Sequence, residues 1–193
     1  ERNVFTDEKL GMVDIHSNAF TKNYNVNQTT KMLVNDFSWR SNMFTNFKGL
    51  ESKFEGLFKI VNYEASDDNV EGYKSEGFNA EASSALAYKA KLPLVKKNIS
   101  KNKINFLTPK LSLRYAPGHM RNIKNDNLKL SYGNLFSINK NAQVDVIEKG
   151  VSAIYGVEIS NNDLDGNVPG KKNYSLSFGQ IYNTEENISM PSR

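Results

Sequence analysis

The sequence predicts an all-β protein that folds as an antiparallel meander of about eight to ten long strands. Three observations support this prediction. Apolar and polar residues alternate along most of the chain, and alternation is the period of a strand. Short segments rich in Asn, Asp and Gly separate the alternating runs, and these residues favour turns. Several runs are also longer than the five or six residues that are common for a globular strand.

The alternating runs follow one another from the beginning of the chain. Weak alternation occurs at residues 13–15, 33–39, 54–60 and 128–132, and strong alternation occurs at residues 79–94, 107–115, 151–159 and 174–182. In the strongest run, from Leu107 to Tyr115, every second residue is apolar, and Lys110 and Arg114 lie between them. Turns are expected at residues 67–69, 98–102, 117–118 and 125–127, and an exposed loop is expected at residues 161–170.

Composition excludes a helical membrane protein but is compatible with a transmembrane β-barrel. The 193 residues are 38% hydrophobic, with a mean hydropathy of -0.58. A helical span needs roughly 20 consecutive apolar residues, and the sequence has no such run. In a transmembrane β-barrel only alternate residues face lipid, so a low mean hydropathy is compatible with it. The long run at residues 79–94 favours a barrel wall, whereas alternation by itself fits a soluble antiparallel sheet equally well.

The sequence contains no recognisable catalytic or metal-binding pattern. Cysteine is absent, and the two histidines, His16 and His119, lack metal-ligand spacing. Asp145 and Glu148 are interpreted as part of a turn or as members of a salt bridge. The net charge is +4, but the lysines are scattered along the sequence, which argues against a nucleic-acid-binding face. We therefore expect no enzyme activity, no cofactor and no nucleic-acid partner.

Three blocks in the second half of the chain carry a family resemblance. The first is residues 107–117, LTPKLSLRYAP, and the second is NLFSINK at 134–140 followed by DVIEKG at 145–150 and Tyr155-Gly156. The third is LSFGQIY at 176–182. These blocks resemble, in order and spacing, segments of the lipopolysaccharide-assembly protein LptD family (also called OstA or Imp). The residues that match the family pattern are Pro109, Tyr115, Pro117, Asn134, Leu135, Phe136, Asp145, Glu148, Gly150, Tyr155, Gly156, Gly179 and Gln180.

The sequence departs from the family pattern at a few positions. Lys140 and Val146 stand where the family usually has arginine, and Asn141-Ala142-Gln143 replaces an aromatic-small-Gly pattern. The family's interdomain disulfides and its periplasmic jellyroll domain have no counterpart in these residues. The resemblance therefore implies that residues 1–193 are part of a barrel domain, as a fragment without the jellyroll and without a signal peptide.

The resemblance also implies a location, a cargo and partners. It predicts a stretch of barrel wall in the outer membrane of a Gram-negative bacterium, within the translocon that inserts lipopolysaccharide into the outer leaflet. An LptE-type lipoprotein plug and an LptA-type periplasmic bridge are the implied protein partners. If the apolar alternates face lipid, the basic alternates face the lumen, where they are candidate contacts for lipopolysaccharide phosphates or for the plug. These candidates are Lys89, Lys91, Lys110, Arg114 and Lys129.

Two other classes of function fit the alternation but do not need the three blocks. One is a different outer-membrane barrel, such as a porin or a receptor. The other is a soluble extracellular β-sandwich that binds partners. The bland interpretation of the basic alternates is that they are solvated charges of a water-filled barrel.

Overall fold

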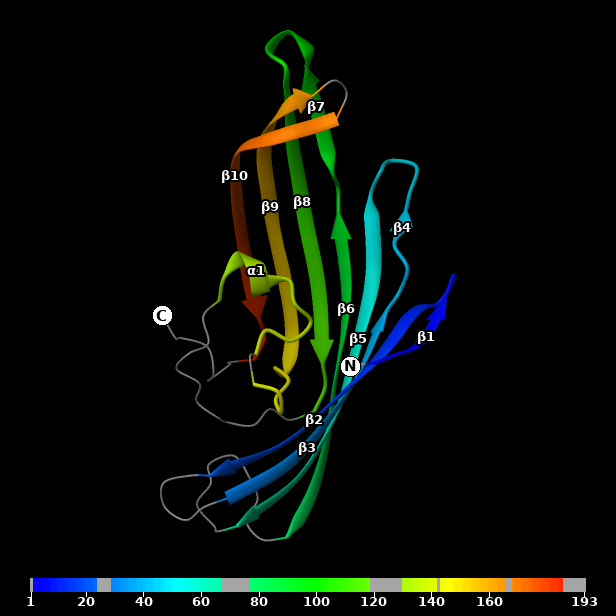
Figure 1. Cartoon of the computed structure of the whole chain (residues 1–193), viewed down its shortest axis with the longest axis vertical. Helices are drawn as coiled ribbons and strands as arrows, with labels where there is room; N and C mark the ends of the chain where they lie inside the picture. The colour runs from blue at the N-terminus through cyan, green and yellow to red at the C-terminus, as the bar shows by residue number, and fades with distance from the viewer. Residues whose placement is uncertain are drawn as a thin grey trace.

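The computed structural model describes residues 2–23, 29–66, 77–118, 130–141, 143–165 and 168–185, and these residues form one ten-stranded antiparallel sheet (Figure 1). The strand order is β1-β2-β3-β5-β6-β8-β9-β10, with β4 beside β5 and β7 beside β8. Neighbours in the sheet are therefore neighbours in the sequence, and the predicted all-β antiparallel meander is confirmed. None of the helices in the described ranges is long and apolar enough to cross a membrane.

The strand bounds agree with the alternating runs in most places. The elements are β1 Arg2–Asp7, β2 Gly11–Asn23, β3 Thr29–Arg40, β4 Phe44–Thr45, β5 Glu51–Ser66, β6 Phe78–Lys91, β7 Leu94–Asn98, η1 Ile99–Lys101, β8 Lys103–Ala116, α1 Tyr132–Leu135, β9 Gly150–Asp165 and β10 Val168–Asn183. The longest of them, β5, β9 and β10, have 16 residues each. The predicted strand length is therefore confirmed.

The long run predicted at residues 79–94 is divided into two strands by a proline. Lys91 pairs with Lys110 and Leu94 pairs with Leu107, so β6 and β7 follow β8 in one uninterrupted register. Between them, the Leu92 N–H still donates to the Pro109 carbonyl at 3.1 Å. Pro93 has no N–H to donate, because its ring replaces it. The interruption is thus local and leaves the sheet continuous.

The connections differ in length between the two ends of the sheet. At the end that we call the short-turn end, β1–β2, β7–β8 and β9–β10 are joined by 3, 4 and 2 residues, and β4 lies within the β3–β5 connection. At the opposite end, which we call the long-loop end, the connections have 5, 11 and 33 residues. The predicted turn at 98–102 is confirmed, since Asn102 adopts a left-handed conformation with φ of 50°.

Three expectations from the sequence are wrong. Residues 161–165 and 168–170 continue β9 and β10 and do not form a loop, because asparagine side chains pair across the strands there. The Asn161 amide donates to Asn105 at 2.7 Å, and the Asn173 amide donates to Asn161 at 2.9 Å. In the described part of the weak run at 128–132 no strand forms: Leu130 is irregular and Tyr132 begins α1. Finally, the lysines are not scattered in space, since six of them gather at the short-turn end.

Other expectations fall on residues outside the described ranges. These are the turns at 67–69 and 125–127, together with His119, Leu128 and Lys129.

Candidate functional site

The two faces of the sheet have inverted polarity. On one face, which we call the exposed face, large apolar side chains lie in register across neighbouring strands, and Leu113, Tyr155 and Phe178 are 49%, 50% and 60% exposed. On the opposite face, which we call the covered face, charged side chains are buried together with apolar ones. Lys59 and Arg114 are each only 2% exposed, and Val61 and Tyr63, on the same face as Lys59, are 2% and 1% exposed. A soluble sheet normally buries its apolar face and exposes its polar one.

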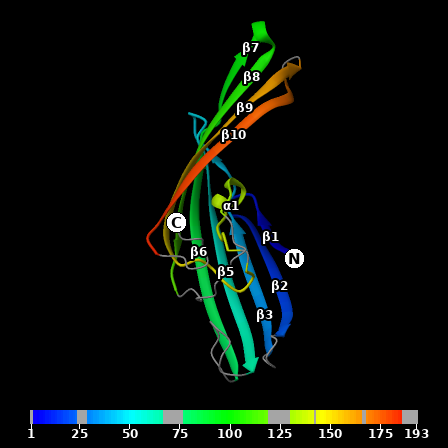
Figure 2. The same ribbon diagram turned by 90° about the vertical axis from the view of Figure 1, so that its left-hand side faces the viewer.

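Residues 130–141 and 143–149, which we call the covering segment, lie against the covered face (Figures 1 and 2). The segment begins with α1, whose first turn is capped because Ser131 N–H donates to the Asn134 side chain at 2.8 Å. Its Ile147 packs with Leu57, Ala85 and Ala116 of the sheet in a small apolar cluster. The segment thus supplies much of the covering that the charged face of the sheet requires.

Two glycines from adjacent strands make room for the start of the covering segment. Gly156 and Gly179 are paired in register across β9 and β10. A Cβ atom on Gly179 would lie 2.4 Å from the Leu135 side chain, and one on Gly156 would lie 3.0 Å from the Phe136 ring. The Gly156 Cβ would also lie 2.7 Å from the Phe178 carbonyl oxygen, which belongs to the backbone and does not move aside easily. Both positions therefore exclude side chains.

We expect Gly156→Ala to lower the free energy of unfolding by about 1–3 kcal/mol, the usual cost of overpacking a close-packed site. The added methyl group would press against both the Phe178 carbonyl and the Phe136 ring. Guanidinium titration of the folded protein measures this difference. Gly133→Ala is the matched control, because a Cβ there is 3.7 Å from its nearest neighbour. Equal stability of the two variants would contradict the assigned contact.

Cations from three strands hold the remainder of the covering segment. Arg114 of β8 donates through Nε to the Ile138 carbonyl at 2.5 Å and through Nη2 to the Glu148 carbonyl at 2.6 Å. The Lys59 ammonium of β5 lies 2.5 Å from both the Asp36 carboxylate and the Val144 carbonyl. Lys22 of β2 lies 3.9 Å from the Asp145 carboxylate. Backbone carbonyls that are buried here are therefore paired with charged donors, as buried polar groups require.

Within the covering segment, Lys140 forms an ion pair with Glu148 at 2.9 Å, and both side chains are almost fully buried. Burial lowers the pKa of the Lys140 ammonium, and the Glu148 carboxylate opposes that shift. The salt bridge predicted for Glu148 is therefore present.

Burial and the nearby Glu158 carboxylate raise the pKa of the Tyr132 phenol to about 12, so its hydroxyl stays protonated at neutral pH.

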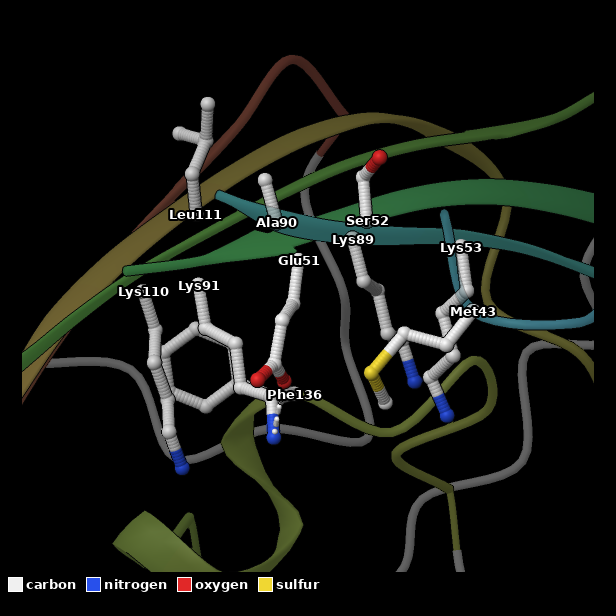
Figure 3. A pocket seen from close by; sticks show the side chains of 10 residues that line it. All are labelled: Met43, Glu51, Ser52, Lys53, Lys89, Ala90, Lys91, Lys110, Leu111 and Phe136. Atoms are coloured by element: carbon white, nitrogen blue, oxygen red, sulfur yellow. Dashed lines mark ion pairs between the residues drawn. The ribbon is translucent and has the colours of Figure 1, made fainter. Parts of the chain in front are cut away.

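A cavity of about 290 Å³ lies on the covered face beside the covering segment, and lysine and glutamate side chains line it (Figure 3). Lys53 and Lys89 both contact Glu55, at 2.7 and 2.5 Å, and Lys91 contacts Glu51 at 2.8 Å. Figure 3 also shows Leu111 and Ala90 pointing to the other side of the sheet. The alternation of polar and apolar residues in the sequence therefore places the charged side chains of the cavity on the covered face and these apolar side chains on the exposed face.

Lys110 forms the wall of this cavity nearest to α1. Its ammonium lies 2.5 Å from Glu158 and 5.7 and 5.8 Å from the ring centres of Tyr132 and Phe136. A cation at that distance from aromatic faces is attracted by their electron density. Lys110 therefore connects the sheet to the covering segment.

The predicted lumen-facing cations share one face, as expected. Lys89, Lys91, Lys110 and Arg114 all lie on the covered face, and Lys129 is outside the described residues. Each of the three lysines contacts a carboxylate, and Arg114 contacts carbonyls of the covering segment. The sequence interpretation missed Lys22 and Lys59, although Lys59 occupies a polar alternate in the run at 54–60.

The structure brings many residues of the three sequence blocks together. Leu135 and Phe136 lie over Gly156 and Gly179, while Asp145 and Glu148 belong to the ionic contacts of the covering segment. Gly150 begins β9 with φ of 99°, a conformation that favours glycine. On the exposed face, the Tyr155 hydroxyl and the Gln180 side chain are 2.5 Å apart.

The remaining block residues do not join this group. Pro109 and Tyr115 lie on the exposed face of β8, and Pro117 follows the end of β8.

Among the described residues, no group of three histidine, aspartate or glutamate side chains could hold a metal ion. No protein-family model matches the chain, and no curated protein matches it either.

Proposed function

We propose that this sheet is part of the wall of a bacterial outer-membrane β-barrel that delivers lipopolysaccharide to the outer leaflet, as proteins of the LptD family do. The observation that carries the membrane part of the proposal is the inverted polarity of the sheet. Leucine, tyrosine and phenylalanine side chains are exposed in rows, while lysine, arginine and glutamate side chains are buried opposite them. Lipid favours such an exposed face, whereas water does not.

The dimensions of the apolar band fit a bilayer. On β8 the exposed face is apolar at every second residue from Leu107 to Tyr115, a stretch of nine residues. A tilted transmembrane strand needs about 9–11 residues. In a bilayer every backbone polar group needs a partner, so the edges of β1 and β10 would pair with further strands of a closed barrel.

The lengths of the connections give the proposed wall an orientation. Outer-membrane barrels have short periplasmic turns and longer extracellular loops. The short-turn end would therefore face the periplasm, and the 33-residue connection between β8 and β9 would start at the outer surface. On this assignment the covering segment folds back into the lumen and narrows it.

The lipopolysaccharide part of the proposal is supported by the three sequence blocks. Residues of the second and third blocks meet where Leu135 and Phe136 of the covering segment pack on Gly156 of β9 and Gly179 of β10, while the first block lies on β8 beside them. Within this proposal, an LptE-type plug and an LptA-type bridge are the expected partners. Lys89, Lys91 and Lys110 already have carboxylate partners, so lipopolysaccharide that passes the cavity would meet lysine–carboxylate pairs rather than unpaired cations.

A photo-crosslinking amino acid at two positions of the intact protein in cells tests both parts. At position 113 on the exposed face, we expect adducts with membrane lipids, because that side chain would face the acyl chains. At position 91 in the cavity, we expect lipopolysaccharide adducts that disappear soon after lipopolysaccharide synthesis is stopped. The adducts at position 113 should persist, because they form with resident lipid.

The two positions give separable outcomes. Absence of lipid adducts at position 113 would reject the membrane wall and favour a soluble β-sandwich. Lipid adducts at position 113 without lipopolysaccharide adducts at position 91 would leave a barrel of another kind, such as a porin, and would reject the transport function.

A further inference from the structure

Two hairpins lie side by side at the short-turn end of the sheet (Figures 1 and 2), and together they carry six lysines. One hairpin joins β7 to β8 and the other joins β9 to β10; Lys103 pairs with Asp163, and the Leu164 N–H donates to the Asn102 carbonyl at 2.8 Å. We call these residues the short-turn lysine cluster. It consists of Lys96, Lys97, Lys101, Lys103, Lys171 and Lys172, all of which are exposed.

The cluster accounts for the positive charge of the whole chain. Residues 94–103 and 163–172 contain these six lysines and only two carboxylates, Asp163 and Asp165. The excess of four positive charges equals the net charge of +4 for all 193 residues. Acidic and basic residues therefore balance over the rest of the chain, and the imbalance is confined to one end of the sheet.

The cluster begins just beyond the apolar band of the exposed face. Leu107, Ile159 and Leu176 form the last fully apolar row across β8, β9 and β10. The next row contains Asn105, Asn161 and Tyr174, and Lys103 lies one row further.

Lys103 is four residues from Leu107, or roughly 13 Å along the strand. On crossing a membrane surface from the acyl chains to the headgroups, tyrosine side chains are expected first and lysine side chains next. The exposed tyrosine of the second row and the lysine of the third row follow this order.

We propose that the short-turn lysine cluster binds the phosphate headgroups of anionic phospholipids in the leaflet next to the short-turn end. This inference rests on the proposed membrane location. Clustered lysines at a membrane surface attract anionic lipids. A lysine side chain is also long enough for its ammonium group to reach the headgroups while its methylene groups stay against apolar surface. Ile99 and Val168, which are 81% and 65% exposed among the lysines, would lie in the same interface.

The test uses the intact protein purified in neutral detergent, with phosphatidylglycerol as the probe and phosphatidylcholine as its uncharged comparison. Native mass spectrometry measures the lipid that remains bound. We expect preferential binding of phosphatidylglycerol, which weakens as the salt concentration rises. The double variants Lys96→Gln/Lys101→Gln and Lys171→Gln/Lys172→Gln should each weaken binding, by roughly five-fold per lysine removed.

The control variant removes the same charge from the opposite end. Lys31 and Lys149 are exposed lysines outside the cluster, so Lys31→Gln/Lys149→Gln should bind phosphatidylglycerol as the unmodified protein does. Equal binding by all three double variants, or no preference over phosphatidylcholine, would overturn the proposal. The proposal would also be overturned if the cluster variants still bound phosphatidylglycerol but bound a polyglutamate peptide more weakly, because the cluster would then bind an acidic protein.

These results are separable from those for the proposed function. Lipid adducts at position 113 combined with unchanged phosphatidylglycerol binding in the cluster variants would reject only the lysine inference. Absence of lipid adducts at position 113 would reject the membrane location on which it rests.

Discussion

Leu111→Arg will lower the free energy of unfolding of the protein folded into phospholipid vesicles by about 2–4 kcal/mol, the cost of a cation at the bilayer midplane. Leu111 lies at the centre of the apolar band on β8, where its side chain is 41% exposed and flanked by Ala90 and Tyr155. A charged side chain at that depth would lose its hydration without gaining a partner. Reversible guanidinium unfolding in vesicles measures the difference.

Val168→Arg is the control for this prediction. Val168 is 65% exposed but lies among the lysines of the short-turn end, where an arginine would reach headgroups and water. Its expected cost is about 0–1 kcal/mol, as for arginine near a membrane interface. If both substitutions were equally harmless, the exposed face would be in contact with water, and the membrane proposal would be wrong.

Arg114→Met will destabilise the protein by roughly 2–6 kcal/mol, because two buried carbonyls would each lose a charged donor at about 1–3 kcal/mol apiece. Those carbonyls belong to Ile138 and to Glu148, and the Glu148 side chain also forms the ion pair with Lys140. Methionine is flexible enough to fill much of the arginine's space, so the loss reports mainly the missing hydrogen bonds. Unfolding free energy and protease sensitivity of residues 130–149 are the two measurements.

Lys91→Met provides the comparison on the same face of the sheet. The Lys91 side chain is 42% exposed and contacts the Glu51 carboxylate of β5, so its removal should cost about 1 kcal/mol or less. Increased cleavage of the covering segment in the Arg114→Met protein, but not in the Lys91→Met protein, would show that Arg114 holds the segment in place. Similar stability and similar cleavage of the two variants would contradict that role.

Much of the sheet could be predicted from the sequence because strand alternation is a local signal. From Leu107 to Tyr115, each residue's face follows from its position alone, and the register agrees. The failure at residues 161–170 has a physical reason. Asparagines usually indicate a loop, but Asn105, Asn161 and Asn173 satisfy one another across three strands. Their partners are distant in sequence, so local composition gives the wrong prediction.

The candidate site was only partly predictable. The family resemblance selected Gly156, Gly179, Leu135 and Phe136. Only the structure shows that they contact one another, because the Leu135 and Phe136 side chains of the covering segment pack over the two glycines. Lys59 was missed, because nothing near it in the sequence shows that its ammonium meets a carbonyl 85 residues away. The lysine cluster was missed for a related reason, since strand pairing joins two hairpins that are about 70 residues apart in the chain.

The sequence by itself determined that this chain forms long antiparallel strands with one apolar and one polar side, because adjacent residues of a strand point to opposite faces of the sheet. Only the tertiary structure decided which side is buried. The covering segment packs on the charged face, since Lys22, Lys59 and Arg114 are placed to hold its carboxylate and carbonyl groups. That choice depends on contacts between residues far apart in the chain, and it leaves the apolar face exposed.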